Sequence, residues 1–310
     1  MNSRATTLIT GGSGFIGQIL IEKLLATSDR RIVAVGRSPV PRFALPQAVS
    51  YHAGDIGDAT FIGPLLDNAT EVIDLAYGTT PKTSFDDPVQ DVISNLPASV
   101  NLQRMASERK NIQRYLLVSS GGTVYGNPQY LPIDESHPNN PISPYGISKL
   151  VTEKYANFFF KMAGLPVIVA RPGNAYGIGQ FGARPQGFIG VAMHAALNNL
   201  QVDIFGERGT VRDYLYIDDL ADGLASLLAN GVAGETYNIG SGVGSDNMDV
   251  VSSLRDVLSV DFQLRVTHRP LRTFDVSANV LDSRKLTTAT GWQPKHSLRQ
   301  GIEKTFNQLK

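Results

Sequence analysis

The chain of 310 residues contains no cysteine. It therefore cannot form disulfides, Cys₄ zinc sites or iron–sulfur clusters, and it has no thiol nucleophile; we expect no metal site. Excess charge of either sign is also missing, because 28 Lys and Arg residues balance 28 Asp and Glu residues. Domains that bind nucleic acid normally carry a basic excess, so we expect no nucleic-acid partner.

Long hydrophobic runs are absent as well. The N-terminal sequence MNSRATTLITGGSGFIG reaches a glycine cluster without the apolar stretch of about 7–15 residues that a signal peptide needs. No run approaches the ~18 apolar residues of a transmembrane helix. We therefore expect a soluble, cytoplasmic protein without a membrane partner. Its 42% apolar residues suffice for a large core, and its length fits about two domains or one large α/β domain with a lobe.

The first half alternates short apolar segments with helical patterns. Strands are expected at residues 5–10, 31–35, 49–53, 71–76 and 115–119, and helices at residues 15–26 and about 86–109. Nearly continuous apolar strands separated by helices indicate a parallel sheet that is covered on both faces. Right-handed crossovers then give a doubly wound α/β (Rossmann) fold.

The second half has a different pattern. A buried strand is expected at residues 166–171, a helix at about 188–200 and a short strand at 202–205, followed by irregular segments. We predict a Rossmann domain over residues 1–172 and a smaller C-terminal α+β lobe, mainly residues 173–310, packed on the carboxyl edge of the sheet. Some segments of the lobe are expected to return to the sheet.

A glycine-rich turn links the first strand to the first helix. Gly11, Gly14 and Gly17 fit the dinucleotide-binding template, as does the overlapping set that begins at Gly12. Such glycines let the backbone approach a pyrophosphate, and the helix N-terminus supplies free N–H groups and the positive end of a dipole. The alternative is a glycine turn that only packs helix against strand. We expect the first domain to bind NAD or NADP.

The end of the second strand bears on the choice between NAD and NADP. An acidic residue there binds the ribose hydroxyls of NAD, but this chain has Gly36-Arg37-Ser38. Arg37 could pair with a 2′-phosphate, which favours NADP; alternatively it is a solvated loop residue, or stacks on the adenine of NAD. Asp55, after the third strand, could bind the adenine amine or cap the next helix.

A Tyr-x-x-x-Lys pair opens a later helix. Ser143 is its expected N-cap and Pro144 its first helical residue, which places Tyr145 and Lys149 at i and i+4 on one face. A phenol is a poor base at neutral pH, because its unperturbed pKa is about 10. A nearby ammonium, together with a positive nicotinamide ring, favours the phenolate and lowers the pKa of Tyr145 towards the working pH. A surface pair on an amphipathic helix is the alternative.

Together these motifs resemble the extended short-chain dehydrogenase/reductase family. The resemblance spans nearly the whole chain, and its nearest group is the nucleotide-sugar 4-epimerases of the UDP-galactose/UDP-N-acetylglucosamine type. It rests on five segments: residues 10–17, Ser119-Ser120-Gly121-Gly122-Thr123-Val124-Tyr125-Gly126, Tyr145-x-x-x-Lys149, Arg171-Pro172-Gly173-Asn174-Ala175-Tyr176-Gly177 and Gly209-Thr210-Val211-Arg212-Asp213-Tyr214.

The resemblance implies a role for each matching residue. Tyr145 would be the catalytic base, and Lys149 would hold the nicotinamide ribose and tune Tyr145. The implied cofactor-binding residues are Gly11, Gly14, Phe15, Ile16, Gly17, Arg37, Asp55, Ile56, Leu75, Ala76, Tyr77, Asn95, Ser119, Tyr145, Lys149 and Pro172. On the substrate side, Asn174 and Arg212 would contact the pyrophosphate and Phe205 would stack on the base. Arg272 and Asp275 would bind phosphate and ribose.

The chain departs from the family pattern at three places. The family's catalytic Ser or Thr position is Gly121, so the hydroxyl that bridges tyrosine and sugar would come from Thr123, or second from Ser120, with Ser119 also available. Asp74-Leu75-Ala76-Tyr77 replaces a His-Leu-Ala-Ala run, which we expect to change only packing. The gate position against N-acetylated sugars is Asn279, a smaller residue than in hexose-restricted epimerases.

The resemblance implies a nucleotide-sugar 4-epimerase that acts through a transient 4-keto intermediate, with cell-surface polysaccharide precursors as the usual destination of the product. The first alternative is an NAD(P)H-dependent reductase of a nucleotide-linked 4-keto-6-deoxysugar. A 4,6-dehydratase is disfavoured, because its Thr-Asp-Glu triplet would fall on Gly121-Gly122-Thr123, which carries no acid. A redox-inactive nucleotide-sensing module is a further alternative, against which the intact Tyr145/Lys149 pair speaks.

Relatives of this type also pair as homodimers through the helix that carries the Tyr/Lys pair. Here that helix continues into Tyr155, Phe158, Phe159 and Phe160, more aromatic surface than one sheet face needs. We therefore expect a homodimer; the alternative is that all four rings belong to the core.

Overall fold

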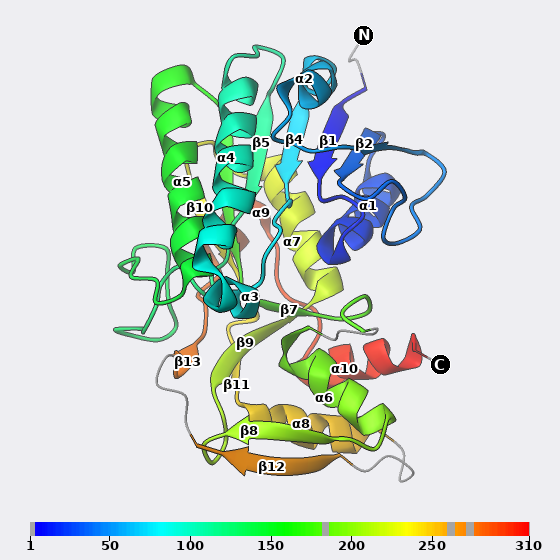
Figure 1. Cartoon of the computed structure of the whole chain (residues 1–310), viewed down its shortest axis with the longest axis vertical. Coiled ribbons are helices and arrows are strands. Elements are labelled where there is room, and N and C mark those ends of the chain that lie inside the picture. The colour runs from blue at the N-terminus through cyan, green and yellow to red at the C-terminus, as the bar shows by residue number, and fades with distance from the viewer. Residues whose placement is uncertain (1–3, 182–185, 259–263, 271–275, 310) are drawn as a thin grey trace.

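The computed structural model describes residues 4–181, 186–258, 264–270 and 276–309. In Figure 1 the chain forms two parts. The larger α/β part contains the N-terminal strands and the long helices, and a smaller lobe lies below it. The lobe lies beyond the carboxyl ends of the sheet strands. None of the helices in these ranges combines the length and apolar character that a membrane crossing demands.

The larger part is built on one parallel sheet of seven strands, in the order β10-β6-β5-β4-β1-β2-β3. Its strands are β1 (Thr6–Thr10), β2 (Arg31–Gly36), β3 (Val49–Ala53), β4 (Glu71–Asp74), β5 (Arg114–Val118), β6 (Val167–Pro172) and β10 (Thr236–Ile239). The doubly wound fold is therefore confirmed. The strand order reverses between β1 and β4, and ligands of open α/β sheets bind outside the carboxyl ends at such a point.

Helices cover both faces of the sheet. Alternate residues of β1 and β2 enter two separate apolar cores, as the period of a strand requires. One core is shared with helices α1 (Phe15–Thr27) and α7 (Ile217–Asn230). The other is shared with α2 (Ala59–Asp67), α4 (Pro88–Ser107) and α5 (Pro144–Ala163).

The long helix expected at residues 86–109 is α4, and a short additional helix, α3 (Pro81–Asp86), precedes it with a break between the two. The break falls at Asp87, whose backbone is non-helical at φ −147° and ψ 89°. Pro88 disfavours the helical conformation of the residue before it, and the Asp87 side chain accepts from the N–H of Gln90 as the N-cap of α4. Helix α2, with Pro64 inside it, is the helix that follows the third strand, and its bounds were not predicted from the sequence.

The segments after residue 205 are regular elements, which corrects the expectation of irregular structure. They are β9 (Val211–Tyr216), α7, β10, β11 (Gly244–Ser245), α8 (Asn247–Val257), β12 (Arg265–Arg269), β13 (Ala278–Asn279), α9 (Arg284–Thr290) and α10 (Leu298–Asn307). Before them come β7 (Asn174–Tyr176), α6 (Gly187–Leu197) and β8 (Gln201–Phe205). Strand β10 returns to the main sheet beside β6, whereas β9 pairs with β7, β11 and β13 in the lobe.

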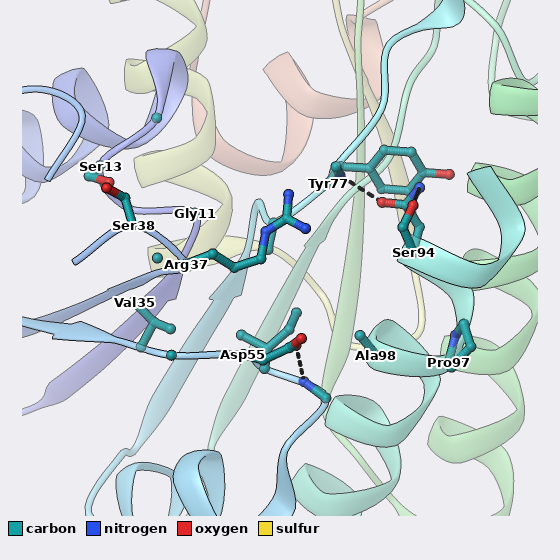
Figure 2. Close-up of a pocket in the computed structure, with 18 of the residues that line it drawn as sticks. Gly11, Ser13, Val35, Arg37, Ser38, Asp55, Tyr77, Ser94, Pro97 and Ala98 are labelled. Carbon is teal, nitrogen blue, oxygen red and sulfur yellow. Dashed lines mark hydrogen bonds between the residues drawn. The ribbon is translucent and has the colours of Figure 1, made fainter. Parts of the chain in front are cut away.

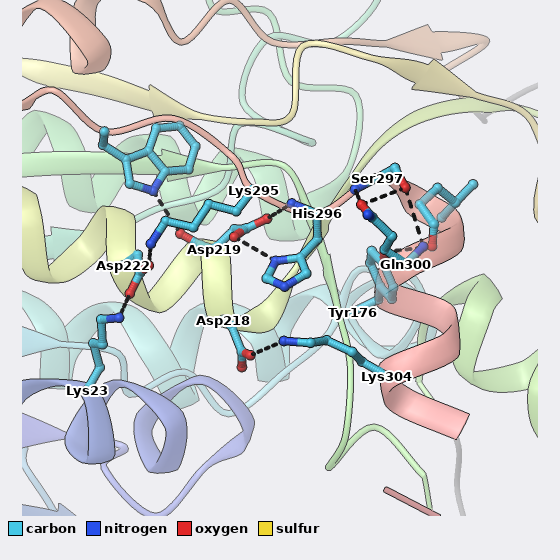
Figure 3. Close-up of polar contacts among 12 residues, drawn as sticks. Lys23, Tyr176, Asp218, Asp219, Asp222, Lys295, His296, Ser297, Gln300 and Lys304 are labelled. Atoms are coloured by element: carbon cyan, nitrogen blue, oxygen red, sulfur yellow. Dashed lines mark hydrogen bonds and ion pairs between the residues drawn. The ribbon is translucent and has the colours of Figure 1, made fainter. Parts of the chain in front are cut away.

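A polar network attaches the C-terminal segment to α7 (Figure 3). The buried carboxylate of Asp219 accepts from the main-chain N–H of His296 at 2.9 Å and lies 2.9 Å from its Nδ1. Asp222 pairs with Lys23 of α1 and Lys295. These contacts hold α10 and the preceding loop against the larger part of the protein.

Candidate active site

Two adjoining cavities, of about 940 and 760 Å³, open at the carboxyl end of the sheet around the β1–β4 reversal. The first extends over the end of β2 and the N-terminal half of α4. The second extends towards α5 and the lobe. Gly11, Gly14, Arg37, Ala76 and Tyr77 line both cavities, so the two share a common wall.

The glycine-rich turn forms one end of this shared wall. A Cβ at Gly17 would lie 2.4 Å from the carbonyl oxygen of Gly12 and 2.7 Å from that of Gly11, so no larger residue fits where α1 packs on the turn. Gly14, the N-cap of α1, provides no side-chain hydrogen bond. The first N–H groups of α1 therefore have no side-chain cap, the arrangement that suits an anion at a helix N-terminus.

Arg37 and Asp55 stand at the rim of the first cavity. Figure 2 shows Arg37 extending across the cavity, between Gly11 and Asp55, towards Tyr77. Asp55 accepts from the N–H of Gly57 at 2.8 Å in a local turn, while Asp58 caps α2. The possibility that Asp55 caps the next helix is therefore wrong. Its exposed carboxylate remains on the cavity wall.

Tyr145 lies on the second cavity, in the first turn of α5. The N-cap assignment is confirmed, because Ser143 accepts from the N–H of Gly146 at 3.1 Å and Pro144 is the first helical residue. The N–H of Tyr145 is also used, and donates to the buried hydroxyl of Ser84 at 3.1 Å. Helix α3 thus fixes the start of α5, and with it the phenol.

Lys149 lies one turn further along α5 and is buried. Its ammonium donates to the carbonyl of Val118 at 3.0 Å, at the end of β5, and lies 4.0 Å from the centroid of the Tyr77 ring. The distance to the centroid of the Tyr145 ring is 5.8 Å. Burial lowers the pKa of Lys149 to about 8, against the opposing effect of the Asp74, Glu153 and Asp91 charges.

The pKa of Tyr145 is raised above its ordinary value, first by burial and second by the charge of Asp91. Lys149 alone therefore does not lower that pKa, and the expectation that it does so together with a positive nicotinamide ring stays a prediction. The physical reason is that the ammonium faces Val118 and Tyr77 more closely than it faces the phenol. Further positive charge beside the phenol is needed to favour the phenolate.

Asp91, which sequence reasoning missed, ties the surrounding segments together. This fully buried carboxylate accepts from the hydroxyl of Ser148 on α5 at 2.6 Å and from the hydroxyl of Thr79. Asn95, one turn along α4, donates to the Asp91 carbonyl at 2.7 Å and accepts from the N–H of Gly78 at 2.6 Å. The i, i+4 spacing of Asp91 and Asn95 on an otherwise mixed helix is the only signal that could have pointed to it.

Tyr77 is part of the site as well. Its ring meets that of Tyr145 edge-on, with centroids 5.0 Å apart, and its face receives the Lys149 ammonium. Tyr77 of the Asp74–Tyr77 run therefore packs against both residues of the Tyr-x-x-x-Lys pair. Asp74 is buried and accepts from Thr10 at 2.7 Å and from Tyr115 at 3.1 Å.

Gly121 has no room for a side chain. A Cβ there would lie 2.6 Å from Cδ1 of Leu281 and 2.8 Å from the carbonyl oxygen of Arg171. Thr123 packs against the first turn of α5, since its carbonyl would lie 2.7 Å from a Cβ at Gly146, and its hydroxyl is buried without a partner among the described residues. The hydroxyl of Ser119 is in the same state.

The expected substrate-side residues separate into three groups. Asn174 and Arg212 line the second cavity, as do Ser120 and Thr123. Phe205 ends β8, half-buried, and Asn279 is buried with its amide donating to the carbonyl of Gly121 at 3.1 Å; neither lines the two cavities described above. Arg272 and Asp275 fall outside the described residues.

Comparison with known proteins identifies the family. Residues 7–240 match the NAD dependent epimerase/dehydratase family. The UDP-glucose 4-epimerase of Mycolicibacterium smegmatis is 30% identical over 305 residues, which cover 96% of each chain. This chain belongs to the NAD-dependent epimerase/dehydratase family. The resemblance to extended short-chain dehydrogenase/reductases is thereby confirmed.

Solved structures and further relatives of this epimerase/dehydratase chain include both 4-epimerases and a 4,6-dehydratase. The Thermotoga maritima UDP-glucose 4-epimerase with UDP-glucose superposes with a TM-score of 0.91 at 28% identity, over 98% of this chain and all of the other. The Thermus thermophilus enzyme in complex with NAD gives 0.87 at 29% identity, over 97% and 98%. The dTDP-glucose 4,6-dehydratase of Streptomyces antibioticus is 28% identical over 315 residues, covering 97% of this chain and 91% of the relative.

Most of the residues that the family resemblance implies for the cofactor lie on the two cavities. The exceptions are Ser119, Lys149 and Pro172, which are buried behind the lining at the ends of β5 and β6 and on α5. Polar residues that the sequence did not single out join them on the second cavity: Thr79, Thr80, Gln180 and Gln186. Within the described ranges, no cluster of three or more His, Asp or Glu side chains is arranged to hold a metal ion.

Proposed function

We propose that this family member inverts C4 of a UDP-hexose or UDP-N-acetylhexosamine through a transient 4-keto intermediate. The observation that carries the proposal is the position of Tyr145. Its phenol lines a cavity whose wall includes both the glycine-rich turn and Asn174 and Arg212 of the second half of the chain. A base in that position can reach a sugar that is held between a dinucleotide and the lobe.

The residues on the first cavity fit a nicotinamide dinucleotide. The close approach at Gly17 and the uncapped start of α1 suit a pyrophosphate, and the buried hydroxyl of Ser119 still needs a partner. Asp55 and Ile56 would hold the adenosine end, while Asn95 and Lys149 would hold the nicotinamide end. When bound, the nicotinamide supplies hydride acceptance and return.

The chain's own residues would then carry the proton. Tyr145, as phenolate, removes the proton of the C4 hydroxyl while C4 is oxidised, and Thr123 relays between the phenol and the sugar oxygen. Lys149 adds positive charge that favours the phenolate. After the 4-keto sugar has presented its opposite face, Tyr145 returns the proton to the reduced C4 oxygen and the other configuration results.

Arg37 favours NADP over NAD. Its exposed guanidinium lies on the cavity rim and no carboxylate replaces it at the end of β2, so a 2′-phosphate would meet attraction instead of repulsion. Arg42 lines the same cavity and adds a second positive charge. NAD, with Arg37 stacked on its adenine, is the alternative.

For the substrate, we propose that Asn174 and Arg212 contact the pyrophosphate, that Phe205 stacks on the base and that Arg272 and Asp275 bind phosphate and ribose. Strand pairing places Asn279 directly beside Arg212. The Oδ1 of Asn279 is buried without a partner among the described residues. A residue of this size at the gate would admit an N-acetyl group.

We propose a homodimer that pairs through α4 and α5. Tyr155 and Phe158 are 44% and 52% exposed, so the possibility that all four rings of this helix are core is wrong; Phe159 is half-buried against the core. The exposed rings continue a helical stripe with Ile147 and Met162 on α5 and Val89, Val92 and Ile93 on α4. Two antiparallel copies of such a face would bury it in a four-helix contact.

The decisive experiment is proton NMR of the purified protein with UDP-N-acetylglucosamine, and separately with UDP-glucose, without added cofactor. Formation of the galacto epimer is expected, and the faster substrate tests Asn279 as the gate. Tyr145→Phe should abolish conversion while the cofactor stays bound; normal turnover by that variant would exclude the assigned base.

The net reductase of a nucleotide-linked 4-keto-6-deoxysugar is the second candidate, because Arg37 suits an exchangeable NADPH. Absence of epimerisation, with consumption of NADPH on addition of such a keto sugar, would favour it. A 4,6-dehydratase activity, as in some relatives, is disfavoured because no acid lies at Gly121-Gly122-Thr123.

A further inference from the structure

Tyr77 occupies a position between the two cavities that neither the glycine-rich turn nor the Tyr-x-x-x-Lys motif explains. It follows β4 and lines both cavities. Its ring face lies 4.0 Å from the Lys149 ammonium, and its ring meets Tyr145 edge-on at 5.0 Å. Its hydroxyl is buried and forms no hydrogen bond among the described residues, while the neighbouring Ser148 hydroxyl donates to Asp91.

The Lys149 ammonium is buried and needs compensation for the water it has lost. An ammonium carries three N–H donors, and the described residues provide one acceptor, the Val118 carbonyl at 3.0 Å. No carboxylate in the described ranges lies within ion-pair distance of it. Besides that carbonyl, the face of the Tyr77 ring, 4.0 Å away, offers the ammonium a second contact of negative electrostatic character.

The carboxylates that face this region are each engaged elsewhere. Asp74 of β4 accepts from Thr10 and Tyr115. Asp91 of α4 accepts from Ser148 and Thr79. Glu153 of α5 forms a buried ion pair with Arg171 of β6. Their charges act on Lys149 only from a distance, and none of them fixes where the ammonium lies.

We propose that the ring of Tyr77 is a positioning group for Lys149, which holds the ammonium charged and beside Tyr145 through a cation–π contact. The catalytic consequence rests on the proposed function. The contact itself does not, and can be tested on the protein without substrate.

The direct test follows the ionisation of Lys149 by NMR, in protein whose lysines carry ¹³C at Cε. The signal of Lys149 is the one that is missing from Lys149→Met. In the unaltered protein the midpoint of the Lys149 pH titration is expected far below that of an exposed lysine, because burial lowers the pKa of Lys149 to about 8. A desolvated cation–π contact corresponds to about one pH unit, so Tyr77→Leu should lower the midpoint by that amount.

The matched control is Tyr77→Phe, which keeps the ring and removes the unpartnered hydroxyl; its midpoint should stay within a few tenths of a unit. Replacing Tyr77 by phenylalanines with increasing ring fluorination weakens the ring's negative face with little change of shape. A graded fall of the Lys149 midpoint is expected across that series. If Tyr77→Leu does not fold, the fluorinated series still tests the cation–π contact. A midpoint unaffected by fluorination, or by Tyr77→Leu in folded protein, would overturn the proposal.

The catalytic consequence is read from the pH dependence of UDP-sugar conversion. If Lys149 must be charged, activity falls as the pH rises through its pKa, and Tyr77→Leu should move this alkaline limb about one unit lower. An NMR shift without conversion of any UDP-sugar contradicts the epimerase proposal alone. An unmoved alkaline limb in an active Tyr77→Leu contradicts the role of Tyr77 in catalysis.

Discussion

The hydroxyl of Ser148 donates to the buried carboxylate of Asp91 at 2.6 Å, and this bond joins α5 to α4 one residue before Lys149. The charge of Asp91 raises the pKa of Tyr145 and counters the burial that lowers the pKa of Lys149. The same carboxylate therefore opposes the phenolate and supports the ammonium. It therefore contributes, after burial, to the pH range in which the two can act together.

Asp91→Asn removes this charge and retains the shape of the side chain. The pKa values of Tyr145 and Lys149 should both fall, because the charge raises both in the unaltered protein. The whole pH–rate profile for epimerisation should then move to lower pH, by about one unit at each limb. Asp87→Asn, the same charge change at the exposed N-cap of α4, is the control and should leave the profile in place.

Gly121→Ala should destabilise the fold by about 1–3 kcal/mol, because the new Cβ would overlap Leu281 and the Arg171 carbonyl. Urea denaturation followed by circular dichroism measures the free energy of unfolding. Gly63→Ala is the control: its nearest side-chain atom lies 3.4 Å away within α2, and alanine favours a helix by up to about 1 kcal/mol. Equal stability of the two variants would contradict the crowding at Gly121.

Thr123→Val removes the hydroxyl that we assign to the proton relay and keeps the volume of the side chain. A fall in kcat of about 100-fold is expected, while Thr123→Ser should retain most of the activity. Bound cofactor, measured by absorbance after denaturation, should be unchanged in both. A larger loss in Ser120→Ala than in Thr123→Val would transfer the role to Ser120.

The variant Arg37→Gln tests whether Arg37 selects NADPH over NADH. If the guanidinium pairs with a 2′-phosphate, its loss should weaken NADPH binding about 10-fold, by fluorescence titration, and leave NADH affinity nearly unchanged. Arg104→Gln, an exposed cation of α4 that pairs with Glu108, is the control. A loss of equal size for both cofactors would indicate that Arg37 stacks on the adenine.

Phe158→Arg should dissociate the proposed dimer, because it places a charge in the centre of the apolar face of α5. Analytical ultracentrifugation should give twice the mass of the chain for the unaltered protein and the mass of one chain for the variant. Val232→Arg changes a residue that is 56% exposed elsewhere and should leave the dimer intact. A monomeric unaltered protein would exclude the dimer.

The sequence by itself determined the α/β sheet and the two motifs of the site. Strands such as residues 31–35 are apolar throughout because both of their faces are buried, and that pattern is local. The turn at Gly11 to Gly17 and the Ser143-Pro144 helix start are also local, so their structure follows from a few neighbouring residues. The elements after residue 205 were missed because they are short and take their order from pairing with distant strands, as β9 does with β7 and β13.

The tertiary structure decided which groups meet at the site. Asp91 and Tyr77 carry no motif, and they act on Lys149 only because α4 and the end of β4 pack against α5. Gly121 lacks a side chain because Leu281, far away in the chain, fills the space. Burial and the charge of Asp91 also set the direction of the pKa shift of Tyr145, which the spacing of Tyr145 and Lys149 does not reveal. Contacts between residues distant in sequence have no local signature, and they govern the electrostatics of this site.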